Sequence, residues 1–249
     1  MRFPGLLAAT AAYIAVLCAF SGAARAQDAF EIQVYDSETA ARGEPGLEVH
    51  VNQQLIDGAS DETHATFEPH YGLADWAELG GYFQTSMTTT GDLSYAGVKL
   101  RLKLRRTGRL WKDRIGLAVN GELSVVPARF ESQMWGSEVR PIIDLREGRL
   151  YAAINPILAI ELKGDAAGHP QLEPAAKIGV RLGTAISVGV EAYGAFGPLD
   201  DLGSEHGSRL FGVVDLTGDW WDVNVGAGYS WGSTEHAVAK MIIGVHPRG

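Results

Sequence analysis

Apolar and polar side chains alternate along most of this chain, and the stretch 221–231 shows the alternation most clearly. One face of this stretch carries Trp221, Val223, Val225, Ala227, Tyr229 and Trp231, and the residues between them are small or polar. A period of two predicts a β-strand, because successive side chains leave a pleated backbone on opposite sides. At a tilt of about 40°, steps of roughly 3.3 Å carry this stretch across about 25 Å, the height of the lipid-facing band of an outer-membrane barrel.

The same alternation predicts twelve strands. They cover 47–55, 64–72, 77–87, 94–104, 114–124, 138–146, 149–162, 173–182, 185–193, 209–216, 221–231 and 237–246. Connections after even-numbered strands are mostly tight and most of the others are longer, with the basic connection 105–113 as the exception. Short turns on one side are typical of outer-membrane barrels, where they face the periplasm. We therefore predict an all-β fold, a transmembrane antiparallel up-and-down β-barrel of about 12 strands within 47–246.

The N-terminal 26 residues have the features of a secretory signal peptide. Arg2 is basic, the following sixteen or so residues are apolar, and Ala24-Arg25-Ala26 forms an A-x-A cleavage site. Residues 27–46 are predicted to form a periplasmic N-terminal lead-in that contributes no strand, so both termini of the mature chain are expected in the periplasm. Cys18 is the only cysteine, and the mature chain is therefore expected to lack disulfides and thiolate metal sites.

The distribution of charge separates a membrane barrel from a soluble one. The predicted apolar faces have no Asp, Glu, Lys or Arg across their middles, where a cation facing lipid would cost about 2–4 kcal/mol. A soluble barrel has the opposite arrangement, with apolar side chains inside and charge outside. The net charge of −9 argues against nucleic acid as a partner. We expect a monomer whose partners are outer-membrane lipid, the barrel-assembly machinery and a small solute.

The polar faces of the predicted strands carry acids and bases in nearly equal number and would line the lumen. The candidate lumen and selectivity residues are Lys99, Arg101, Lys103, Arg114, Glu78, Glu122, Arg140, Asp144, Lys177 and Arg181. The run from Lys99 to Arg105 has two interpretations. It is either a positive ladder that draws anions through the barrel, or a set of ion pairs with acids on neighbouring strands, such as Glu78 and Glu122. The balance of charge favours the second interpretation and a narrow channel.

Aromatic residues at the ends of the predicted strands suggest membrane girdles. The candidates are Tyr71, Trp76, Trp221, Tyr229 and Trp231. No Ser–His pair falls on the lipid-facing set, where a lipid-modifying enzyme would need a nucleophile and its base. His50 and Glu68 are predicted on adjacent strands, but a structural hydrogen bond accounts for such a pair better than catalysis. The sequence has no metal-ligand spacing and no phosphate loop, so we predict neither catalytic residues nor a metal or cofactor.

Several short motifs spread over 47–245 resemble a family of bacterial outer-membrane transporters of the MetA-pathway-of-phenol-degradation type. They are Phe67-Glu68-Pro69, Tyr71-Gly72-Leu73, Glu78-Leu79-Gly80-Gly81-Tyr82, Arg140-Pro141-Ile142-Ile143, Asn155-Pro156-Ile157-Leu158, Glu173-Pro174-Ala175-Ala176-Lys177, Glu191-Ala192-Tyr193-Gly194 and Lys240-Met241-Ile242-Ile243-Gly244. The resemblance implies an outer-membrane barrel, and it brings no catalytic residues. The chain departs from the usual pattern at its last strand, where His246 stands in place of a terminal aromatic residue.

These observations predict a cell outer-membrane channel for passive uptake of small solutes, with aromatic or amphiphilic compounds as candidates. The main alternative is a closed structural barrel whose loops 125–137, 163–172 and 194–208 bind a partner. A lipid-modifying outer-membrane enzyme is a weaker alternative.

Overall fold

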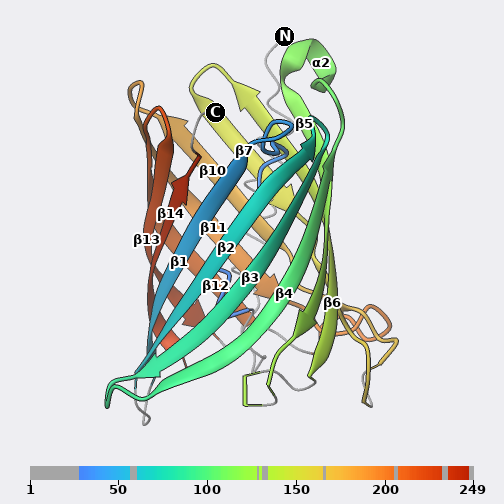
Figure 1. Ribbon diagram of the computed structural model, residues 1–249, viewed down its shortest axis with the longest axis vertical. Coiled ribbons are helices and arrows are strands. Elements are labelled where there is room, and N and C mark those ends of the chain that lie inside the picture. The colour runs from blue at the N-terminus through green and yellow to red at the C-terminus, as the bar shows by residue number, and fades with distance from the viewer. Residues whose placement is uncertain are drawn as a thin grey trace.

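The computed structural model describes residues 28–56, 61–127, 129–130, 134–164, 167–204, 207–231 and 235–246. The predicted signal peptide, 1–26, lies outside these residues, as do the last three residues of the chain. No helix in the described part is long and apolar enough to cross a membrane. The fold consists of antiparallel strands around a lumen (Figure 1).

Within the described residues, the alternating stretches form fourteen labelled strands, and one connection contains a short helical turn. The strands are β1 (Pro45–Ile56), β2 (Glu62–Ala74), β3 (Ala77–Thr88), β4 (Leu93–Arg105), β5 (Ile115–Val125), β6 (Trp135–Glu147), β7 (Leu150–Asn155), β8 (Leu158–Glu161), β9 (Gln171–Leu172), β10 (Ala175–Arg181), β11 (Ile186–Ala195), β12 (Gly207–Thr217), β13 (Trp221–Trp231) and β14 (Glu235–Val245). The helical turn α2 (Leu110–Asp113) lies in the basic connection between β4 and β5.

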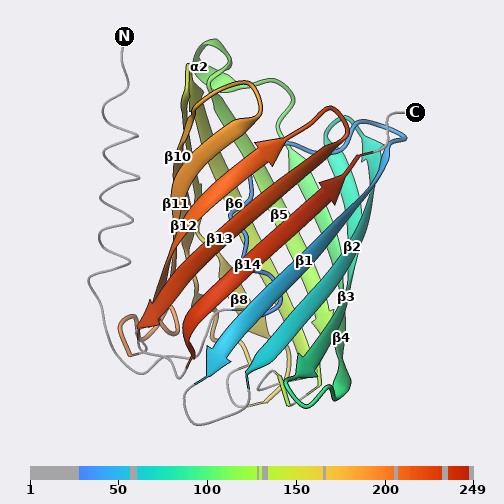
Figure 2. The same cartoon turned by 90° about the vertical axis from the view of Figure 1, so that its left-hand side faces the viewer.

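The strands close into a barrel of twelve, as the sequence predicts. Consecutive strands pair around the ring, and the first and last strands, β1 and β14, pair from Leu47↔Val245 onward. Two predicted strands are each divided in two at a proline, which lacks the N–H needed for the ladder. Pro156 separates β7 from β8, and Pro174 separates β9 from β10. The fourteen labelled strands therefore occupy twelve positions around the barrel wall, and all are tilted in the same sense (Figure 2).

The two faces of the barrel wall have the predicted chemistry. Along β4, Leu100 is 55% exposed on the outside whereas its neighbour Arg101 is 2% exposed inside. Phe67 and Phe83, which pair across β2 and β3, are also exposed outward. An exposed apolar outer face and a buried charged interior suit a barrel that sits in lipid. We call the end with the tight connections the short-turn end, and the opposite end the long-loop end.

The N-terminal residues 28–42, which we call the luminal segment, run inside the barrel from the long-loop end to the short-turn end. At one end, Phe30 stacks on His64 near the start of β2. At the other, the main-chain N–H of Gly43 donates to the carbonyl of Gly72 near the end of β2. The prediction of a periplasmic lead-in is therefore wrong for this segment. It forms no strand, as expected, but it fills the lumen instead of lying outside the barrel (Figure 2).

Gly97 creates a bulge in β4 that keeps the alternation in phase with the wall. Its φ is +135°, and the register between β3 and β4 shifts opposite it, between Gln84 and Thr85. An added Cβ would lie 2.8 Å from the Val125 carbonyl oxygen. We expect Gly97→Ala to lower the free energy of unfolding by about 1–3 kcal/mol. Urea unfolding in micelles, followed by tryptophan fluorescence, measures the loss.

Gly91 provides the matched control for this substitution. It also has a positive φ, +86°, but an added Cβ would meet nothing within 4 Å. Gly91→Ala should therefore cost less than Gly97→Ala. Equal losses in the two variants would show that the close approach to Val125 is unimportant.

Candidate functional site

Acids of the luminal segment meet bases of one wall of the lumen. We call these bases the basic track; they are Lys99, Lys103 and Arg105 of β4, Arg109 of the following connection, and Arg140 and Arg146 of β6. Glu31 lies 3.1 Å from the Arg140 guanidinium and 3.6 Å from the Lys99 ammonium, which also contacts Asp28. Further along, Asp36 lies 2.7 Å from Arg146. All four carboxylates of the segment are thus paired with the track, since Glu38 contacts Arg105 and Arg109.

Tyr35 fixes the middle of the luminal segment. Its main-chain N–H donates to the Asn155 side-chain oxygen at 2.7 Å, and its carbonyl accepts from the Asn155 amide at 3.0 Å. Its hydroxyl lies 2.8 Å from that of Tyr82. Three cations surround the ring, with the guanidinium of Arg140 nearest at 4.5 Å from the centroid. These cation–π contacts and the paired amide bonds place the segment in a defined register.

The opposite side of the segment is apolar. Ile32 and Val34 pack into a buried cluster contributed by several strands, which we call the apolar wall: Ala153, Ile157, Ala175, Tyr193, Phe211, Val213 and Val238. These residues share the inward face with the charged groups, so the lumen is not uniformly polar. Its cross-section has a basic side on β4 and β6, and the apolar wall lies on β7, β10, β11, β12 and β14, beside charged residues of the same strands.

His50 and Glu68 lie together in the lumen, as predicted. His50 Nε2 is 3.3 Å from a Glu68 carboxylate oxygen and 3.6 Å from Glu48. The ligand atoms of these three residues lie within 4.8 Å of one another, close enough for a cation. However, the Arg101 guanidinium is 2.8 Å from the other oxygen of Glu68 and also contacts Glu78. Arg101 thus supplies a positive charge beside Glu68 and Glu78, and we interpret the group as a structural network.

A second charge network lies across the lumen from the basic track. Glu191 contacts the ammonium groups of both Lys240 and Lys177, the latter at 3.1 Å, and it accepts a 2.6 Å hydrogen bond from the Tyr193 hydroxyl. Lys177 also pairs with Asp215 at 2.7 Å. Lys240 reaches the luminal segment as well, donating to the Ile32 carbonyl at 2.8 Å. The last strand is therefore linked to the segment through a buried lysine.

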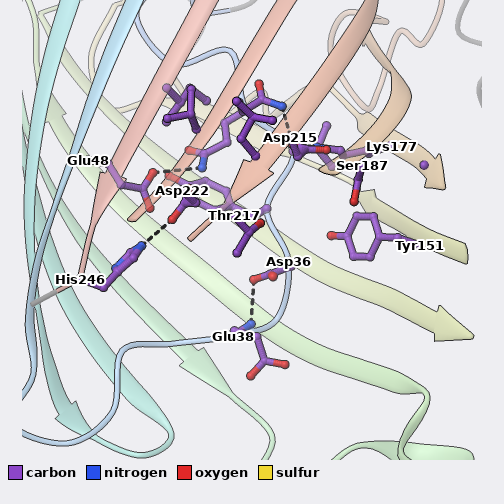
Figure 3. Close-up of a pocket in the computed structure, with 18 of the residues that line it drawn as sticks. Asp36, Glu38, Glu48, Tyr151, Lys177, Ser187, Asp215, Thr217, Asp222 and His246 are labelled. Atoms are coloured by element: carbon purple, nitrogen blue, oxygen red, sulfur yellow. Dashed lines mark hydrogen bonds and ion pairs between the residues drawn. The ribbon is translucent and has the colours of Figure 1, made fainter. Parts of the chain in front are cut away.

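A cavity of about 940 Å³ occupies the short-turn end of the lumen, between the luminal segment and β10–β14. Figure 3 shows Asp36 and Glu38 of the segment among the residues that line the cavity, together with Lys177, Asp215 and Tyr151 of the wall. The lining mixes these polar groups with Leu216, Val223 and Ile242. At its rim, His246 bonds to Asp222 at 2.7 Å, and this contact raises the pKa of the His246 imidazole.

Most of the predicted lumen residues lie in the lumen. Arg101, Lys103, Glu78, Glu122, Arg140, Asp144 and Lys177 are buried inside the barrel, and the Lys99 side chain is 9% exposed there. Arg114 and Arg181 instead lie at the rim of the short-turn end, where Arg114 pairs with Glu147 at 3.0 Å and Arg181 donates to the Gly148 carbonyl. The interpretation of the basic run as ion pairs with neighbouring strands fits Arg101, which meets Glu68 and Glu78. It is incomplete for Lys99, Lys103 and Arg105, because their partners include the luminal segment.

The predicted girdle residues lie at the two ends of the barrel wall. Tyr71, Trp76 and Trp221 are at the short-turn end, and Tyr229 and Trp231 at the long-loop end. Four of them are exposed and Trp221 is half-buried. Their contact with the membrane interface remains a prediction.

Sequence reasoning missed the luminal segment, Arg109, Asn155 and the apolar wall. One signal was available: 28–38 contains four acids and no base, and β4 carries four bases and no acid. The apolar wall also had a signal. Tyr193, Phe211 and Val213 each stand two positions from a charged residue of the same strand, so their side chains point to the same side of the wall as that charge. Asn155 had none, since its role depends on which main-chain groups lie opposite it.

The closed barrel, its apolar exterior and its charged interior define a class, that of porin-like outer-membrane β-barrel folds. No protein-family model matches the chain, and no curated protein does. Among solved structures it is similar to the KdgM porin, with a TM-score of 0.55 and 9% identity over 81% of this chain and 99% of that one. It is similar to the NanC porin with a TM-score of 0.56 and 9% identity over 82% and 100%. At this identity the likeness concerns the fold.

Proposed function

We propose that this protein is an outer-membrane channel for passive uptake of small solutes. The observation that carries the proposal is the cavity, lined by polar and apolar side chains, at the short-turn end of a closed barrel whose outer face is apolar. Channels of this architecture conduct through a lumen lined by charge. The KdgM porin, one of the similar folds, has been solved in complex with oligogalacturonate, which supports a solute-binding lumen here. In this proposal the tight connections face the periplasm, and residues 1–26 act as a signal peptide.

We also propose a family and a membrane environment for this protein. The short motifs and the barrel together support kinship with the phenol-degradation-type transporters. The protein acts as a monomer in outer-membrane lipid, after insertion by the barrel-assembly machinery, and it is not an enzyme. The mixed lining of the cavity, where Tyr151 and Leu216 lie beside Lys177 and Asp215, suits amphiphilic solutes.

One observation favours the alternative of a closed structural barrel. The luminal segment fills the lumen between the cavity and the long-loop end, and its backbone is bonded to wall residues such as Asn155, Thr66 and Asn52. A barrel permanently closed by this segment would present its loops to a partner and conduct nothing. The two functions therefore differ in a property that is directly measurable.

Planar-bilayer recording of the refolded chain tests the channel. We expect stepwise currents of small amplitude, because the luminal segment restricts the path to the cavity and its margins. The current should grow with salt concentration. Silence of both the full chain and a variant lacking 28–42, with folding verified by circular dichroism, would reject the channel in favour of the closed barrel.

A further inference from the structure

The luminal segment contacts the surrounding wall through the kinds of chemical group that a bound ligand would use. One of its edges carries four carboxylates paired with the basic track, and the other carries Ile32 and Val34 packed against the apolar wall. We propose that residues 28–38 occupy, within their own chain, a lumenal binding site for elongated amphiphilic carboxylates, which pass through the barrel by replacing the segment. This inference rests on the proposed channel function and names its solute class.

The charges of the wall require an anionic occupant. The lumenal face of β4–β6, with the connection between β4 and β5, carries the six bases of the basic track together with Arg101, whereas Glu122, Glu138 and Asp144 are its acids. Arg101 is matched by Glu68 and Glu78 of other strands. The six remaining bases exceed these three acids by three, a surplus that is covered by the four carboxylates of Asp28, Glu31, Asp36 and Glu38. Buried charges must be paired, so this site accepts carboxylates and disfavours neutral or cationic solutes.

A solute that binds in this site must also have an apolar edge, which covers the apolar wall. Phe211 and Ala175 are fully buried, and Val213, Val238, Ile32 and Val34 are nearly so. Removing Ile32 and Val34 alone would expose this cluster to water inside the barrel, which is unfavourable for apolar surface. A purely polar anion would leave that surface uncovered. An acid with an aryl or alkyl chain covers it while its carboxylate meets Arg140 or Lys99.

The segment is attached in a way that allows exchange. None of its residues belongs to a strand, so it takes no part in the ladder hydrogen bonds of the barrel. It is instead held by side chains, such as Asn155 on Tyr35 and Glu78 on the Ala40 N–H. Its displacement therefore breaks no strand pairing and leaves the closed ring intact.

The test compares the full chain with two altered segments. One variant lacks 28–42, and the other keeps its length but is neutral through Asp28→Asn, Glu31→Gln, Asp36→Asn and Glu38→Gln. A matched control neutralises four exposed acids outside the lumen, Asp92, Asp200, Asp201 and Asp219, to asparagine. The control should behave as the full chain, with small currents and weak selectivity. Both altered segments should conduct several-fold more and prefer anions, as judged by reversal potential in a salt gradient.

The solute class is tested with three probes of related structure. Phenylhexanoate has both a carboxylate and an apolar tail. Adipate has carboxylates without an apolar tail, and phenylhexanol has the tail without a carboxylate. Phenylhexanoate should block the current of the altered variants at concentrations at least about ten-fold lower than either of the others. Lys99→Gln with Arg140→Gln should remove that preference. Calorimetry on the micellar barrel measures the same ranking independently of conduction.

The outcomes separate this inference from the proposed function. Currents without anion preference, or equal action of the three probes, overturn the binding site and leave the channel standing. Selective binding by calorimetry in a barrel that never conducts supports the site and rejects the channel. Equal affinity of phenylhexanoate for the full chain and for the variant lacking 28–42 overturns the claim that the segment occupies the site.

Discussion

Glu191→Gln is expected to lower the free energy of unfolding by about 3–5 kcal/mol, because it removes the counter-charge of the buried Lys240 ammonium and leaves Lys177 with Asp215 alone. Glu191 is 2% exposed, and it is shared by Lys240, which is 3% exposed, and Lys177. The amide of glutamine has nearly the same shape, so the loss reports charge and not a cavity. Urea unfolding in micelles measures it.

A surface ion pair serves as the control for Glu191→Gln. Glu147 pairs with Arg114 at 3.0 Å at the rim, where both side chains reach solvent. Glu147→Gln should cost at most about 1 kcal/mol. Adding Lys240→Met to Glu191→Gln should recover part of the larger loss of stability, because the buried ammonium that has lost its partner is then removed. A Glu191→Gln variant as stable as the Glu147→Gln variant would show that the lumen is hydrated enough to solvate the lysines.

Leu100→Arg is expected to lower the stability of the barrel in lipid by about 2–4 kcal/mol. Leu100 lies in the middle of β4, faces outward and pairs with Gly81 and Leu123 on the neighbouring strands. An arginine here would place a charge in the hydrocarbon region. The measurement is reversible unfolding from lipid vesicles.

Leu93→Arg is the matched control on the same strand. Leu93 is 71% exposed and stands at the first position of β4, at the long-loop end. An arginine there reaches the interface, so its cost should be about 0–1 kcal/mol. Similar losses at both positions in lipid would contradict the membrane location of the middle of β4.

The fold could be predicted because two constraints act on each wall residue. The pleat determines the side to which its side chain points, and the contrast between lipid and lumen determines whether that side chain is apolar or polar. Leu100, Arg101 and Leu102 illustrate this: their order alone determines which faces outward. Strand ends were predicted to within about three residues, except where Pro156 and Pro174 divide a strand. The ends of strands are set by local turns, which alternation does not describe.

The lumen could be predicted only in part, because it depends on contacts between residues far apart in the sequence. The inward side of β4 follows from its own pattern, but the partner of Lys99 is Asp28, a residue in a segment with no strong periodicity. Tyr35 and Asn155 are joined across 120 positions. A pattern local to one strand carries no information about such a partner.

The route of the luminal segment also bears on the order in which the molecule folds. Ile32 accepts its hydrogen bond from Lys240, 208 positions later in the chain, on the strand that closes the ring against β1. Contacts of such sequence separation form late, since the intervening loop must first be closed by other structure. The earliest described residues are thus among the last to reach their native contacts, because the strands that they contact must first come together as a wall.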